Sequence, residues 1–309
     1  MGTNVQSFAV ANLRRRPVVV EVGGFVVGVD PSTTSPFINY ATPLPGARPT
    51  GRDVAALIDA FRERGLKPRL EFAPDAAPAV EAALSEAGFT VEEVHEYLVC
   101  TPATLTMPPT LGELASASTS TSASAARSSA SRSSASTSAS SSTSASGTAS
   151  AATSAGAEYG WFRVESPSKE AEYRAIDAAL AEAFSGVFAS SPEGAARLRR
   201  TEDDGGAVRF VRASEGGCAG AAMCSAPAEG TAELAGVGTR PAFRGRGIAA
   251  AVTAALTETM FARGARSVWL EYSGDGSRRV YERVGFRPEG TRLYMSLEPA
   301  DEVDSPAGG

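Results

Sequence analysis

Apolar and polar positions divide the front of the chain into short strands and two helices. Two apolar runs within residues 18–29 meet at Gly23-Gly24, which predicts a hairpin. Asp53 is expected to cap a helix whose apolar residues repeat at helical spacing. The elements predicted after the hairpin are strands at 37–40, 70–72 and 96–100 and helices at 54–64 and 77–87.

The back of the chain shows a longer alternation of strands and helices. The predicted strands are 161–164, 207–213, 218–225, 232–238, 267–272 and 287–297, and the predicted helices are 168–184, 192–200, 248–263 and 276–284. Strands that feed helices in this order predict an α/β fold in which helices flank a mixed sheet.

Between these two regions the sequence is almost entirely Ser, Ala and Thr. It lacks large apolar side chains, so no burial offsets the entropy of ordering it, and we expect a flexible linker. The predicted organisation is a front domain at 1–110, the linker at 111–157, a second domain at 158–300 and a disordered tail at 301–309.

The two domains share a pattern. Gly88-Phe89 and Tyr97 recur at the same spacing as Gly285-Phe286 and Tyr294. Upstream of each, Leu70-Glu71-Phe72 recurs as Leu270-Glu271-Tyr272. Because these motifs recur in the same order in both domains, we predict that the front domain is a smaller copy of the same α/β unit.

The segment Arg244–Ala249 stands between a predicted strand and a predicted helix. Its two glycines allow a tight turn, and the helix directs free N–H groups and a positive dipole end into that turn. Such a turn suits a phosphate or pyrophosphate, and Arg244 and Arg246 add charge. It is neither a Walker A loop nor a dinucleotide fingerprint, because the residues that complete those motifs are missing.

This segment resembles the pyrophosphate loop of the GCN5-related N-acetyltransferases (GNAT), Arg/Gln-x-x-Gly-x-Gly/Ala, as Arg244-x-x-Gly247-x-Ala249. The resemblance continues through Ser267–Tyr272 and Ser277–Phe286, and covers about residues 160–299. It implies a GNAT-like mixed sheet preceded by a degenerate copy, with acetyl-CoA as co-substrate and transfer of its acetyl group to an amine.

The resemblance also implies which residues hold the coenzyme. Backbone groups of Val237 and Thr239 would hold the pantetheine arm. The pyrophosphate would bind the Arg244 side chain and the amides of Gly245, Arg246, Gly247, Ile248 and Ala249. Ser277 joins this set where the motif has alanine, and Gly274 stands where many members have asparagine.

Two residues are candidates for catalysis. Tyr281 falls where the family has the acid that protonates the leaving thiolate, and a phenol with a pKa of about 10 is protonated at neutral pH. Its ring could instead only pack under the coenzyme. Glu233 falls where the family often has a base, although a strand also places solvated glutamates there. Glu271 is a weaker candidate, because its match to Glu71 favours a structural role.

The front copy lacks this chemistry. Residues 44–49 stand opposite the glycine-rich segment and contain two prolines, which have no N–H to donate. Leu84 stands opposite Tyr281. We therefore expect the front copy to be inert and to lend a wall to the substrate cleft. His95, the single histidine, is interpreted as a structural strand residue.

Composition and charge limit the kinds of partner that this chain can bind. The net charge of −6 argues against a nucleic-acid binder, and no segment reaches the length of a membrane span. Three cysteines without metal spacing indicate reduced thiols, no metal site and a cytoplasmic protein, and abundant Arg, Ala and Gly favour a bacterial source. The expected acceptor is a small-molecule or peptide amine, and the oligomeric state is unknown. A non-catalytic acyl-CoA-binding regulatory or scaffold module is the alternative.

Overall fold

The computed structural model describes residues 2–108, 157–159 and 162–298. Within these residues one twelve-stranded sheet has the order β1-β2-β3-β4-β12-β5-β11-β10-β9-β8-β7-β6. Its strands are β1 (Val18–Val22), β2 (Phe25–Val29), β3 (Tyr40–Pro43), β4 (Arg69–Phe72), β5 (Thr90–Cys100), β6 (Ala157–Tyr159), β7 (Phe162–Glu165), β8 (Ala207–Arg212), β9 (Cys218–Cys224), β10 (Thr231–Thr239), β11 (Ser267–Glu271) and β12 (Arg287–Ser296).

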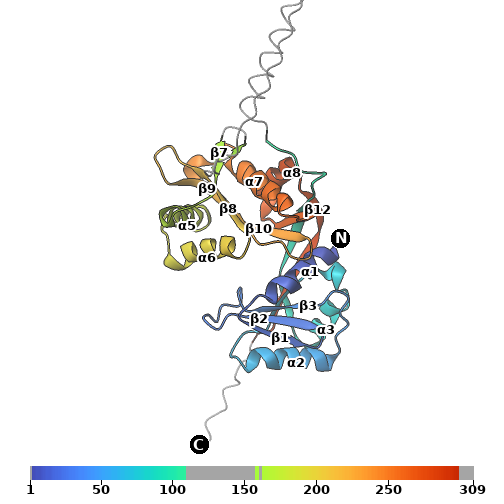
Figure 1. Ribbon diagram of the computed structural model, residues 1–309. Helices are drawn as coiled ribbons and strands as arrows, with labels where there is room; N and C mark the ends of the chain where they lie inside the picture. Colours follow the sequence, from blue (N-terminus) through green and yellow to red (C-terminus); the bar gives the residue numbers. More distant parts are fainter. Residues whose placement is uncertain (1, 109–156, 160–161, 299–309) are drawn as a thin grey trace, which may run out of the picture.

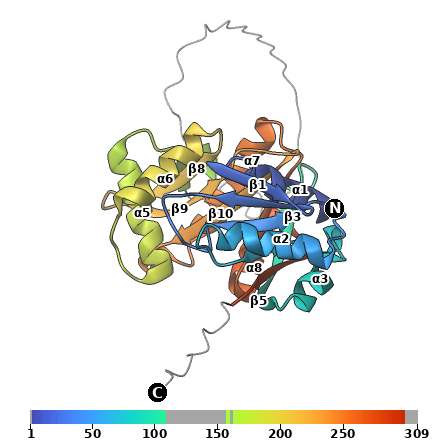
Figure 2. The same cartoon turned by 90° about the horizontal axis from the view of Figure 1, so that it is seen from below.

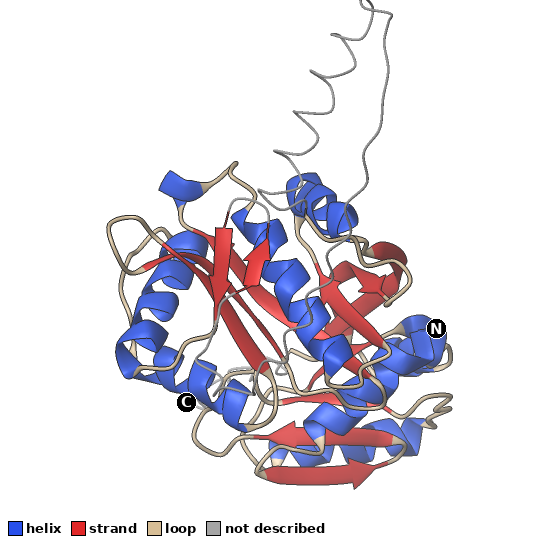
Figure 3. Ribbon diagram, turned by 45° about the horizontal axis from the view of Figure 1, so that its top comes forward, coloured by secondary structure: helices blue, strands red, loops and turns tan. Residues whose placement is uncertain are grey.

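Helices cover both faces of this sheet (Figure 3). The front half carries α1 (Gly2–Leu13), α2 (Gly51–Arg62) and α3 (Val80–Glu86), and the back half carries α5 (Glu170–Ser185), α6 (Pro192–Asp203), α7 (Ile248–Ala262) and α8 (Gly274–Val284). In the back half α7 packs on one face of the sheet, while α5 and α6 pack on the other. Helix α1 contacts β10 from the front half (Figure 2). The expected mixed sheet flanked by helices is confirmed.

The two halves exchange their last strands. The front strand β5 pairs with β11 of the back half, and the back strand β12 pairs with β4 of the front half. Between them β5 and β12 pair with each other and run side by side from one half to the other (Figure 1). The exchange is symmetric in register, because Glu71 faces Tyr294 just as Glu271 faces Tyr97.

Each core therefore contains side chains of the other half. Leu293 and Met295 of β12 lie in the core formed by α2, α3 and the front strands. Leu98 and Cys100 of β5 lie in the core beneath α7. All four are buried, so neither half completes its own core.

Most predicted elements are confirmed, including the hairpin at Gly23-Gly24 and the helix after the glycine-rich segment. The strand predicted at 37–40 is wrong, because residues 37–39 form a turn and β3 begins at Tyr40. Thr50, not Asp53, caps α2, and Asp53 is the third helical residue of the same capping box. Most of the predicted linker and all of the predicted tail lie outside the described residues.

Candidate active site

The glycine-rich segment forms a bend that leads directly into α7. Gly247 has φ +90° and caps the helix without a side-chain hydrogen bond, and no acidic residue occupies the first turn of α7. The left-handed φ is the reason that glycine suits this position. The backbone amides of residues 245–250 have no acceptor among the described residues. They form a cluster of free donors at the positive end of a helix dipole.

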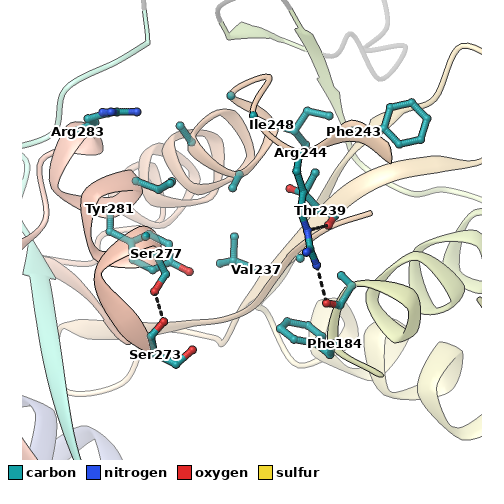
Figure 4. A pocket seen from close by; sticks show the side chains of 18 residues that line it. Phe184, Val237, Thr239, Phe243, Arg244, Ile248, Ser273, Ser277, Tyr281 and Arg283 are labelled. Carbon is teal, nitrogen blue, oxygen red and sulfur yellow. Dashed lines mark hydrogen bonds between the residues drawn. The ribbon is translucent and has the colours of Figure 1, made fainter. Parts of the chain in front are cut away.

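A cavity of about 700 Å³ opens beside this bend (Figure 4). Its walls come from the end of α5, the end of β10, the bend with the start of α7, and α8. The predicted coenzyme and catalytic residues that line it are Val237, Thr239, Arg244, Gly245, Gly247, Ile248, Ala249, Ser277 and Tyr281. Arg246 and Glu233 are not among its lining residues.

Both arginines of the bend contact backbone carbonyl oxygens. Arg244 donates from Nε to the Thr239 oxygen at 3.2 Å and from Nη2 to the Ala183 oxygen at 3.0 Å, which joins the end of α5 to β10 (Figure 4). Arg246 donates to the Ala242 oxygen at 3.1 Å. Arg244 thus lies at the cavity, and Arg246 lies outside it.

Strands β10 and β11 pair for only a short distance next to the cavity. The parallel pairing joins Thr231–Glu233 to Ser267–Trp269 and then stops. On the other side, the register with β9 shifts between Ala235 and Gly238, where Gly236 has φ +60°. The shift bends β10, and its edge beyond Glu233 has no strand partner toward β11. That unpaired edge can bind the amides of an extended ligand.

Tyr281 extends from α8 into the cavity and is only 8% exposed (Figure 4). Its ring packs edge-on against Phe286 at 6.2 Å between centroids. Its hydroxyl has no hydrogen-bond partner among the described residues, and burial raises the pKa of this phenol to about 12. A protonated, unpartnered hydroxyl that faces a cavity can donate a proton or a hydrogen bond.

Ser277 has a hydroxyl directed at its own helix. The hydroxyl donates to the Ser273 backbone oxygen at 2.6 Å (Figure 4), and the Gly274 backbone oxygen lies 2.8 Å from it as a second acceptor. Gly274 begins α8 with φ +78°. The Ser277 side chain therefore stabilises the first turn of α8 while lining the cavity.

Glu233 lies on the opposite face of β10. Its neighbours Ala232 and Leu234 pack beneath α7, and side chains alternate along a strand, so Glu233 points toward the other face. Its partly buried carboxylate has no hydrogen-bond or ion-pair partner among the described residues. Burial raises the pKa of Glu233 to about 7; the positive charge of Arg292 opposes this shift, and the charges of Glu271 and Glu71 add to it. A carboxyl group with this pKa can accept a proton near neutral pH.

Glu271, in contrast, has its carboxylate fully engaged. It accepts hydrogen bonds from Arg292 at 2.7 Å and from the Tyr294 hydroxyl, and His95 lies 3.1 Å away. Burial favours a higher pKa for Glu271, but Arg292 and Tyr294 outweigh it and hold the pKa of Glu271 below its usual range. These contacts join β11 to β5 and β12, which is a structural role.

Several cavity residues have no signal in the coenzyme motifs. Ala183 and Phe184 come from the end of α5, and Phe184 is 67% exposed at the cavity edge. Their position depends on how α5 crosses the sheet, and only the apolar character of a helix end could have drawn attention to them. Within the described part of the chain, no group of His, Cys, Asp or Glu side chains is arranged to hold a metal ion. No helix there is long and apolar enough to cross a membrane.

Comparison with known proteins identifies the family of the back half. Residues 173–286, which include β10, the bend, α7 and α8, match the sequence profile of the acetyltransferase (GNAT) family. This part of the chain is a GNAT domain. The family supports acyl transfer as its general chemistry. No protein of curated function matches the sequence.

Solved structures extend the likeness to the front half. A GCN5-related N-acetyltransferase from Kribbella flavida is 21% identical, with 98% of each chain covered and a TM-score of 0.67. A tandem GNAT protein from the clavulanic acid biosynthesis pathway is 12% identical, covers 97% of this chain and 89% of its own, and has a TM-score of 0.53. A putative acetyltransferase of the GNAT family from Novosphingobium aromaticivorans is 18% identical, with coverages of 96% and 97% and a TM-score of 0.51. The fold of a GNAT domain with a GNAT-like front half is therefore shared along nearly the whole chain.

Proposed function

We propose that the GNAT domain transfers the acetyl group of acetyl-CoA to a primary amine by direct attack in a ternary complex. The observation that carries this proposal is the row of free amides at 245–250, which borders the same cavity as the unpartnered Tyr281 hydroxyl. A diphosphate needs several donors without competing acceptors, and the start of α7 supplies them.

The residues present fit acetyl-CoA as co-substrate. Amides of Gly245 to Ala249 and the Arg244 side chain would hold the pyrophosphate. The unpaired edge of β10 at Val237 and Thr239 would hold the amides of the pantetheine arm. The arm would then lie between β10 and α8, which directs the thioester toward Tyr281.

In the proposed reaction the amine nitrogen attacks the thioester carbonyl carbon. A C–N bond forms, the C–S bond breaks, and the thiolate takes a proton from the Tyr281 hydroxyl. Glu233 removes the proton that the amine loses, and the amine approaches from the face of β10 on which Glu233 lies. The pKa of Glu233, about 7, suits a base near neutral pH, and the pKa of Tyr281, about 12, keeps its hydroxyl protonated but makes it a weak acid.

Two measurements test this function. Isothermal titration should show acetyl-CoA binding, and chromatography should show CoA release that depends on an added amine. Binding without release by any amine in a broad panel would favour the non-catalytic acyl-CoA-binding module instead. Absence of acetyl-CoA binding would reject both.

A further inference from the structure

A second cavity, of about 230 Å³, lies between the two halves of the chain. Asn12, Arg15 and Arg16 line it from the end of α1 and the segment after it, and Asp204 and Ser225 line it from the back half. Since liquid water occupies about 30 Å³ per molecule, this cavity has room for a group of several heavy atoms.

This inter-half cavity borders the strand position of Glu233. The Ser225 backbone amide donates to the backbone carbonyl oxygen of Glu233 at 2.8 Å, and the Glu233 backbone amide donates to the Ser225 hydroxyl at 2.9 Å. Glu233 pairs with Trp269 of β11, and paired residues point to the same face of a sheet. Trp269 packs against Phe8 of α1, and the cavity is lined by Asn12 of that helix and by Arg16 just after it. Glu233 and the cavity therefore lie on the α1 side of the sheet, opposite α7. Arg16 also lowers the pKa of Glu233, which burial raises, so the guanidinium acts on that carboxylate.

Arg16 is the cation that is free to take a ligand. Among the described residues its guanidinium group has no hydrogen-bond or ion-pair partner, and its aliphatic stem lies against Gly28. Arg15 donates to the Pro227 oxygen at 3.3 Å, a contact that joins the two halves at this cavity. Arg200 adds positive charge nearby, while Asp30, Asp204 and Glu233 supply negative charge without an ion pair to Arg16.

We propose that the inter-half cavity binds the anionic end, a carboxylate or phosphate, of an amine acceptor whose nitrogen lies at Glu233. The acceptor is thus a small zwitterion. Arg16 binds its anion through charge-assisted hydrogen bonds, and Glu233 faces its amine. This inference rests on the proposed acetyl transfer, and it gives the front half a specific task, since Arg15 and Arg16 both belong to it.

Two matched pairs of amines test the proposal. Alanine differs from ethylamine by a carboxylate, and O-phosphoethanolamine differs from ethanolamine by a phosphate. In the full-length protein, kcat/KM should be higher for the anionic member of at least one pair. Arg16→Gln should lower the ratio of anionic to neutral kcat/KM about tenfold to a hundredfold, mainly through KM, because a charged hydrogen bond is lost. The pair with the larger change identifies the anion.

Arg14→Gln is the matched control, because Arg14 pairs with Glu21 at 2.8 Å on the surface and does not line the cavity. It should leave the ratio unchanged. An equal loss for both members of each pair in Arg16→Gln, or no preference for an anionic member in the unaltered protein, would overturn the proposal.

A binding experiment separates this inference from the proposed function. Titration with inorganic phosphate and with acetate, at constant ionic strength, should show binding that Arg16→Gln weakens about tenfold or more and Arg14→Gln does not. If acetyl-CoA binds but no amine is acetylated, this titration still decides whether the cavity holds an anion. Anion binding that is unaffected by Arg16→Gln would reject the site, whatever the activity.

Discussion

Helices α2 and α7 begin at corresponding places in the two halves, and their N-termini differ in one physical respect. At α2 the Thr50 amide donates to Asp53 at 2.8 Å in a capping box, and the preceding segment donates from Leu44 and Gly46 to backbone oxygens. At α7 the cap residue Gly247 has no side chain to accept a hydrogen bond, the first turn has no acidic residue, and the amides of 245–250 have no acceptor among the described residues. The same kind of helix start has its donors satisfied in the front half and leaves them free for a ligand in the back half.

The exchanged strands give the test with the largest expected effect. A fragment that begins at residue 157 lacks β5, so β11 and β12 lose their shared neighbour and the core beneath α7 loses Leu98 and Cys100. We expect no folded, acetyl-CoA-binding protein, as measured by circular dichroism and gel filtration. Co-expression of residues 1–108 with 157–309 restores both strands and should restore binding. An active fragment on its own would show that the front half is dispensable.

Transplanting the α2 cap onto α7 comes next. Ala250 occupies the position that Asp53 has in α2, the third residue of the helix. Ala250→Asp should satisfy the Gly247 amide and repel phosphate, and it should weaken acetyl-CoA binding about a hundredfold, because one charged hydrogen bond is lost and a like charge is added. The melting temperature should stay the same or rise. Ala250→Asn is the uncharged control and should weaken binding much less. If both variants weaken binding equally, the negative charge is not the cause.

The third test concerns the tyrosine that the front half replaces with Leu84. Tyr281→Phe removes one hydroxyl from the cavity and should lower kcat about tenfold to a hundredfold, which is less than the loss of a typical general acid, because a pKa of about 12 makes this phenol a weak acid. The Kd for acetyl-CoA should change little, since the ring remains. Tyr272→Phe removes a hydroxyl bonded to Glu96 outside the cavity and serves as the control. An unchanged kcat in Tyr281→Phe would leave the ring a packing role only.

The smallest effect is a pH dependence. Burial raises the pKa of Glu233 to about 7, so the base is protonated and inactive below that pH, and kcat/KM should rise with pH to a plateau, with its midpoint near 7. Glu233→Gln should lower the plateau and remove the rise of kcat/KM with pH.

A raised carboxyl pKa in the folded protein also means that the free energy of unfolding falls as pH rises through that pKa. Glu233→Gln should therefore unfold at a higher temperature than the unaltered protein at pH 8. An identical pH profile in both proteins would exclude Glu233 as the base.

The glycine-rich bend and its helix could be predicted from the sequence because their signals are local. Gly245 and Gly247 mark the bend, and the long apolar run that follows marks α7. Placement of Tyr281 at the cavity followed from the resemblance to the family. The position of Glu233 opposite the coenzyme cavity could not be predicted, because it depends on which face α7 covers.

The first helix and the exchanged strands could not be predicted for a different reason. Helix α1 carries no charged residue, and its Gln6 is buried, so its sequence shows no polar face. Gln6 is satisfied by Thr42 at 2.8 Å, the Pro43 oxygen at 2.6 Å and the Ala73 amide at 2.9 Å, which are distant in sequence. The repeat also predicts that β5 and β12 are strands, but not which strand each one pairs with. By pattern alone, β5 and β12 could each pair with either β4 or β11.

Because Leu293 and Met295 belong to the core of the front half, that core depends on residues that are synthesised long after its own helices and strands. A ribosome that has made α2, α3 and β5 carries a nascent sheet with open edges at β4 and β5 until residues 287–296 emerge. Neither half can complete its sheet before β12 is made, and a stop codon before β12 would leave two incomplete sheets instead of one finished half.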